Sequence, residues 1–132
     1  MATDEIKYLS YAEAVLLHIL LMRDWSETRY GVFDRALLES TLARPEHSAT
    51  YERADLVRQA ATLFLGLIKN HPWVGGNKRT ATALVDEFLF RSGVEVKASL
   101  IDLLELVVAV EADRWEVDEI EWWLRQRVAD LP

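Results

Sequence analysis

Two apolar helical stretches separated by a loop limit the possible fold more than any other feature of the sequence. In the first stretch, apolar residues recur three or four positions apart and predict a helix that ends near Asn70: Leu56, Ala60, Leu63, Phe64, Leu67 and Ile68. Pro72 and the pair Gly75-Gly76 then prevent a regular helix. A second helix is predicted from Asn77 to Ser92-Gly93, with its apolar side formed by Ala81, Leu84, Val85, Phe88 and Leu89. The sequence therefore predicts two buried neighbouring helices joined by an unusual polar loop.

The rest of the chain is also predicted to be helical. Ser10 and Glu13 have the spacing of a capping box, and a long apolar helix follows to about Trp25. Asp34 is predicted to cap a short helix that Pro45 stops, followed by a polar loop to Tyr51. Two more helices are expected, one from Ser99 to before Arg114 and one with Ile120, Trp123, Leu124, Arg127 and Val128 on one face.

These elements predict an all-α protein, a compact bundle of about six helices with little or no strand. Only Val94–Val96 alternates in the manner of a short extended segment. No composition change marks a boundary, so residues 1–132 are expected to form a single domain.

Composition restricts the classes of function. The formal net charge is -7, which disfavours direct nucleic-acid binding because such binding needs a basic surface. The N-terminal residues are acidic, unlike those of a signal peptide, and the apolar stretches are about half of the roughly 20 residues that span a bilayer. The chain has no cysteine. We therefore expect a cytoplasmic protein without a membrane partner.

The loop at residues 71–79, HPWVGGNKR, has the composition of a phosphate site. Gly75 and Gly76 allow a ligand to approach the backbone closely, and the N–H groups at the start of the helix at Asn77 attract anions. Lys78 and Arg79 add two positive charges to this position in an acidic chain. The sequence predicts a local anion site.

His71 precedes this site and could take a proton at neutral pH. A histidine beside a bound nucleotide could deprotonate an incoming hydroxyl group. The corresponding reaction is transfer of a phosphoryl or nucleotidyl group to a protein side chain, driven mainly by positioning and charge neutralisation.

The residue order HPWVGGNKRTA at residues 71–81 resembles the signature of the Fic/Doc family. That signature is usually written as His, any residue, Phe, any residue, Asp or Glu, Gly or Ala, Asn, Lys or Gly, Arg. The ending NKRTA looks like the Doc branch, the death-on-curing toxins of toxin–antitoxin pairs. The segment LESTLARP at residues 38–45 and the SGV after the second helix also resemble Doc proteins. The resemblance covers nearly the whole chain.

The resemblance implies a role for each motif residue. His71 would be the general base, and Trp73, in the usual Phe position, would anchor the loop in the core. Gly75, Gly76 and Asn77 would line the anion-binding turn. Lys78 and Arg79 would hold the nucleotide phosphates. The segment 28–33 would form a flap that receives the target protein as an added strand.

The resemblance also implies the reaction and its partners. Doc-like members are kinases of a translation elongation factor, so the chain would transfer a phosphoryl group from ATP, with Mg²⁺, to a hydroxyl side chain. Its antitoxin would bind through a Phd-like segment. Transfer of AMP remains an alternative, although Lys78, where AMP-transferring members usually have Gly, favours phosphorylation.

Position 75 departs from the signature, because Gly75 replaces the acid that normally helps to hold Mg²⁺. The metal ligands are therefore unknown. Water or another carboxylate could complete a metal site, the chain could bind nucleotide and turn over slowly, or it could be a Doc-like binding module without catalysis. Restoring an acid at position 75 would separate these readings.

Several other conspicuous residues have plain structural interpretations. His18 lies on an apolar helix face and is expected to be a core or boundary histidine. Asp86 and Glu87 are expected on a solvated helix face, with a replacement metal ligand as the lesser alternative. Trp123 is expected in the core, whereas Trp122 is either exposed or half-buried.

Overall fold

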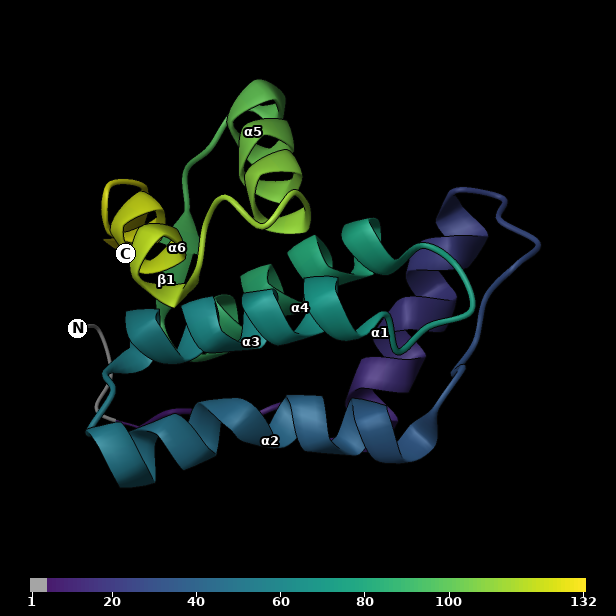
Figure 1. The fold of residues 1–132 in the computed structure, drawn as a ribbon, viewed down its shortest axis with the longest axis horizontal. Coiled ribbons are helices and arrows are strands. Elements are labelled where there is room, and N and C mark those ends of the chain that lie inside the picture. The colour runs from purple at the N-terminus through teal and green to yellow at the C-terminus, as the bar shows by residue number, and fades with distance from the viewer. Residues whose placement is uncertain (1–4) are drawn as a thin grey trace.

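The computed structural model describes residues 5–132, and within them the chain forms six helices and two short strands (Figure 1). The elements in chain order are α1 (Tyr11–Asp24), α2 (Arg35–Glu52), α3 (Leu56–Asn70), α4 (Asn77–Arg91), β1 (Val94–Val96), α5 (Leu100–Glu111), α6 (Val117–Arg125) and β2 (Val128–Asp130). The expected all-α class is confirmed, and the described helices include none long and apolar enough to cross a membrane.

Helix α3 is the centre of the fold. It packs against α2 on one side and against α4, α5 and α6 on others, so it is covered by layers of helices (Figure 1). Its buried side chains include Leu63, Phe64, Leu67 and Ile68, which are at most 2% exposed. Burying such side chains contributes about 2 kcal/mol each. The predicted core of the two motif-flanking helices is confirmed.

The helix starts follow the local sequence. Ser10 and Glu13 form the predicted capping box of α1, because each side chain accepts a hydrogen bond from the other's backbone N–H. Asp34, Asp55 and Ser99 accept from backbone N–H groups at the starts of α2, α3 and α5. The sequence therefore locates most of the helix boundaries.

The prediction that Pro45 stops the second helix is wrong. Helix α2 continues through Pro45 to Glu52, and Pro45 itself is buried. A proline removes one N–H and normally costs about 3 kcal/mol within a helix. Here α2 lies along α3 over its length (Figure 1), so tertiary packing compensates for the lost hydrogen bond.

The predicted last helix is too long by one turn. Helix α6 ends at Arg125, and Val128 lies in β2, which pairs antiparallel with β1 in the register Val94↔Asp130 and Val96↔Val128. The extended segment at Val94–Val96 is confirmed. Trp123 is 2% exposed and Trp122 60% exposed, so the first is a core residue and the second belongs to the surface.

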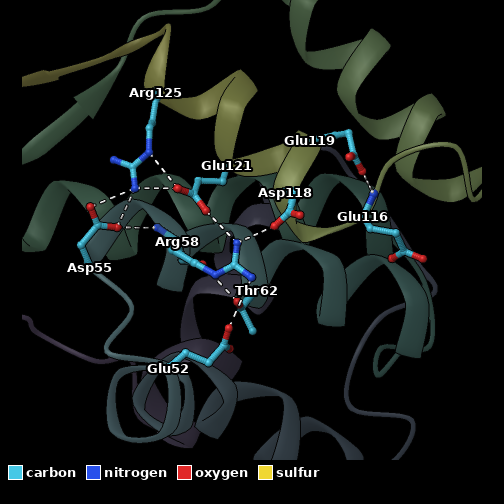
Figure 2. Close-up of polar contacts among 9 residues, drawn as sticks. All are labelled: Glu52, Asp55, Arg58, Thr62, Glu116, Asp118, Glu119, Glu121 and Arg125. Carbon is cyan, nitrogen blue, oxygen red and sulfur yellow. Dashed lines mark hydrogen bonds and ion pairs between the residues drawn. The ribbon is translucent and has the colours of Figure 1, made fainter.

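A group of ion pairs attaches α6 to the N-terminal half of α3 (Figure 2). Arg58 of α3 donates to Asp118 and Glu121 at 2.7 and 2.8 Å, and reaches Glu52 at 3.3 Å. Arg125 of α6 donates to both carboxylate oxygens of Asp55 at 2.9 Å. These residues are called the α3–α6 cluster below.

Candidate functional site

The loop between α3 and α4 is held in one conformation by its own side chains. His71 ends α3 with left-handed backbone angles (φ 48°), which turns the chain out of the helix. Asn77 closes the loop, because its amide oxygen accepts from the Trp73 N–H at 3.0 Å and its amide nitrogen donates to the Trp73 carbonyl at 2.9 Å. The Trp73 side chain is 2% exposed and belongs to the hydrophobic core.

The segment that precedes α2 lies directly on this loop, at the same end of the molecule (Figure 1). Val32 and Trp73 form an antiparallel bridge. The Phe33 N–H donates to the Pro72 carbonyl at 2.8 Å, and the Val74 N–H donates to the Gly31 carbonyl at 2.9 Å. Residues 28–33, called the flap below, therefore add an extended edge beside the loop.

Gly75 and Gly76 are each required in the loop for a different structural reason. Gly76 has φ 68°, and a Cβ there would lie 2.5 Å from the Met22 sulfur. At Gly75 a Cβ would lie 2.5 Å from the backbone carbonyl oxygen of Arg29 in the flap. No side chain can occupy that position unless the flap backbone moves. An acid at position 75 would therefore displace the flap, and restoring it is not a clean test of activity.

The start of α4 differs from the other helix starts. Gly76 is the N-cap residue, and among residues 5–132 no side chain caps the helix. The backbone N–H groups of the first turn are therefore free to bind an anion, and the helix dipole favours one there. Residues on this turn and its neighbours line a cavity of about 920 Å³. The motif residues on its wall are His71, Gly76, Asn77, Lys78 and Arg79.

The two motif cations each have one acidic neighbour on the cavity wall. Lys78 lies 3.3 Å from a carboxylate oxygen of Glu111, and Arg79 lies 3.3 Å from one of Glu27. The Arg79 guanidinium also lies over the Trp25 ring at 4.1 Å from its centre. The side chains of Lys78 and Arg79 remain 58% and 37% exposed, so a ligand can reach both.

The sequence did not indicate Glu27, Trp25 or Glu111 as site residues. Glu27 and Trp25 follow α1, and Glu111 is the last residue of α5, so only the fold brings them to the loop. Their residue types and spacing carry no local signal. Lys69, which is close to the motif in the sequence, pairs with Asp113 and is not on the cavity wall.

His71 itself is exposed, and its ring forms no hydrogen bond within residues 5–132. It shares the cavity wall with Lys78 and Arg79. An incoming hydroxyl group therefore has access to the imidazole from the solvent side. This arrangement is compatible with a general base next to a bound phosphate chain.

The described residues do not supply the acid that the signature would place near a metal ion. Position 75 has no side chain, and residues 5–132 contain no group of three or more His, Asp or Glu side chains arranged to hold a metal. Glu87 pairs with Arg91, as a surface residue would. Asp86 is exposed towards the cavity, and partial desolvation by the cavity wall, followed by the nearby Glu87 charge, raises the pKa of its carboxyl group.

Comparison with known proteins agrees with the geometry. Residues 8–89, more than half of the chain, match the sequence model described as the Fic/DOC family. The protein named Toxin Doc from Mycolicibacterium smegmatis is 41% identical over 71 residues, which cover 51% of this chain and 53% of that protein. The chain thus spans about half the length of the curated relative it matches.

Proposed function

The chain belongs to the Fic/Doc family, and from that premise we propose that it transfers a phosphoryl group from ATP to a hydroxyl side chain of another protein. One observation carries the proposal. His71, the uncapped start of α4, and the cations Lys78 and Arg79 all line one cavity, and the loop after His71 is hydrogen-bonded to the flap. A phosphate chain and a protein hydroxyl could meet there.

The proposed chemistry uses each motif residue once. The N–H groups at Gly76 and Asn77 and the charges of Lys78 and Arg79 bind the phosphates, with bidentate contacts available to the guanidinium. His71 removes the proton of the target hydroxyl. The hydroxyl oxygen forms a bond to the γ-phosphorus while the bond from that phosphorus to the β,γ-bridging oxygen breaks, and ADP leaves.

The flap supports a protein as the acceptor. Its backbone bonds to the loop hold an extended edge next to His71. A target segment added to that edge would present a hydroxyl group to the imidazole. The resemblance of the motif to Doc proteins implies a translation elongation factor as the target and growth arrest as the consequence. It also supports a cognate antitoxin, with a Phd-like segment, as the partner.

Two alternatives each have a feature in their favour. Transfer of AMP would use the same cavity with the α-phosphate next to His71. A binding module with weak or no catalysis is favoured by Gly75, because no carboxylate stands at that position. The proposed kinase must therefore work without an acid at position 75.

The test uses bacterial lysate, Mg²⁺, and ATP labelled at either the γ or the α phosphate. The inactive variant is His71→Asn, because asparagine accepts left-handed backbone angles and cannot act as the base. The matched control is His47→Asn, at an exposed histidine of α2. We expect the γ label on one protein band with the wild type and His47→Asn, and none with His71→Asn.

Other results would change the assignment. A band labelled only from the α phosphate would make the chain an AMP transferase. No label from either nucleotide, with ATP binding retained, would make it a binding module.

A further inference from the structure

One buried histidine connects the flap to the motif helix. His18 of α1 is 0% exposed, and its Nε2 accepts a hydrogen bond from the Gly31 N–H in the flap at 3.0 Å. Its other ring nitrogen, Nδ1, lies 2.9 Å from the hydroxyl oxygen of Thr80 in the first turn of α4. The ring also stacks on Trp73, with the ring centres 4.0 Å apart and the planes 14° apart.

These contacts determine the protonation of the ring. An amide N–H can only donate, so Nε2 must be the unprotonated nitrogen, and Nδ1 carries the proton and donates to Thr80. Burial lowers the pKa of His18 to about 4, which agrees with a neutral ring at neutral pH. The ring is thus a fixed bridge with one donor and one acceptor.

The bridge contacts the flap, the motif loop and the first turn of α4, but it does not face the cavity. It holds Gly31 of the flap, Trp73 of the loop and Thr80 of α4, whereas His18 is absent from the residues on the cavity wall. Gly31 has φ 111° and offers no side chain of its own to hold the flap. The distance between flap and loop is also limited at position 75, where the Arg29 carbonyl fills the space of a Cβ.

We propose that His18 is a positioning residue, which fixes the flap edge relative to the motif loop and thereby sets how well a target segment docks beside His71. The inference rests on the proposed function, because it assumes that the flap receives the target. His18 acts on the flap through Gly31 and on the motif helix through Thr80. It does not touch nucleotide or the reacting atoms.

Two substitutions separate the halves of the bridge. In His18→Gln the amide group reaches the level of Nε2 and can still accept from Gly31. In His18→Asn the amide reaches only the level of Nδ1, so the Thr80 contact can remain while Gly31 loses its acceptor. Both variants are compared with the wild type for hydrogen exchange of the Gly31 amide, ATP affinity and labelling rate across a dilution series of bacterial lysate.

With His18→Asn we expect the exchange rate of the Gly31 amide to rise about tenfold. The lysate concentration that gives half-maximal labelling should rise by about the same factor, because a tenfold change corresponds to the loss of one hydrogen bond. The maximal rate and the ATP affinity should change less than about twofold, since the cavity wall is intact. In His18→Gln both values should lie close to those of the wild type, because the glutamine amide can still accept from Gly31. A merely structural role would instead lower overall stability and affect both variants equally.

The inference is overturned if Gly31 stays as protected in His18→Asn as in the wild type, or if only the maximal rate falls. Should His18→Asn not fold, the wild type alone decides, because rapid exchange of its Gly31 amide would contradict the bridge. If the wild type labels no lysate protein, the proposed transfer fails. Gly31 exchange in the variants then still shows whether His18 holds the flap.

Discussion

Arg58 and Arg79 both lie beside carboxylates, but their surroundings differ in the respects that decide what an arginine does. Arg58 contacts three acids on the packed α3–α6 cluster, two of them within 2.8 Å (Figure 2). Arg79, within residues 5–132, pairs with one acid, Glu27, at 3.3 Å and lines a cavity. The hydrogen bonds that Arg58 donates to Asp118 and Glu121 raise the pKa of its guanidinium group.

The acids of the two regions differ in the same way. Burial alone would raise the pKa of Glu121, but hydrogen bonds from Arg58 and Arg125 outweigh burial and lower it. The Glu121 carboxylate is thus held by its hydrogen bonds to Arg58 and Arg125. Glu27 and Glu111 each meet one exposed cation across the cavity wall. A phosphate chain could replace these single pairs, whereas in the α3–α6 cluster Arg58 already contacts three carboxylates. The number and geometry of contacts, more than residue type, therefore separate structural from ligand-binding charges.

The largest expected effect comes from His71. His71→Asn should lower the transfer rate about 10²- to 10⁴-fold, the usual contribution of a general base. The free energy of unfolding should change by less than about 0.5 kcal/mol, because the side chain is exposed and the backbone angles suit asparagine. Rate and urea unfolding are measured on the same preparation. A large loss of stability would place His71 with the structural residues.

The second prediction concerns the pH dependence of stability. His18 has a pKa of about 4 in the folded chain and an ordinary value near 6.5 when unfolded, so the unfolded state binds the extra proton between these values. Stability is complete above pH 6.5 and falls by about 3 kcal/mol as the pH drops through 4. Urea unfolding at several pH values measures this fall. His18→Gln should remove that part of the pH dependence; an unchanged profile would contradict it.

The third prediction addresses the α3–α6 cluster. Arg58→Met should destabilise the chain by about 2 kcal/mol, because Asp118, Glu121 and Glu52 would face one another without their shared cation. The matched control is Arg35→Met, which within residues 5–132 forms an ion pair only with Glu39, one helical turn away on the exposed surface. That pair should contribute less than about 0.5 kcal/mol. If both variants lower the unfolding temperature equally, the α3–α6 cluster contributes no more to stability than an exposed ion pair.

The smallest expected effect is at Glu27. Glu27→Gln removes the negative charge that competes with phosphate for Arg79, so ATP affinity should rise by no more than about fivefold. The free energy of unfolding should change by less than about 0.5 kcal/mol. Calorimetric titration with ATP measures the first quantity. Weaker ATP binding would instead mean that Glu27 itself helps to hold the nucleotide.

The sequence predicts the features of the fold and site that depend on local chemistry. Helix starts follow from side chains three residues apart, such as Ser10 and Glu13, and the motif loop follows from Pro72 and its glycines. Apolar spacing predicts the burial of α3 and α4. These signals are local because a cap or a helical face is formed by neighbours in the chain.

The remaining features depend on contacts between distant segments. Pro45 continues a helix only because α2 packs on α3, and Val128 becomes a strand only because Val94–Val96 lies beside it. The Arg29 carbonyl at position 75 and the bridge at His18 join segments that are far apart in the sequence. Local sequence propensity contains no information about such tertiary contacts.

The most direct test applies one substitution to both regions. ATP affinity and thermal unfolding are measured for Arg79→Met and Arg58→Met alongside the wild type. We predict that Arg79→Met weakens ATP binding about tenfold or more with little change in stability, because a charge-assisted phosphate contact is lost. Arg58→Met should lower the unfolding temperature and leave ATP binding unchanged. If Arg79→Met binds ATP as the wild type does, the cavity at the motif loop is not the nucleotide site.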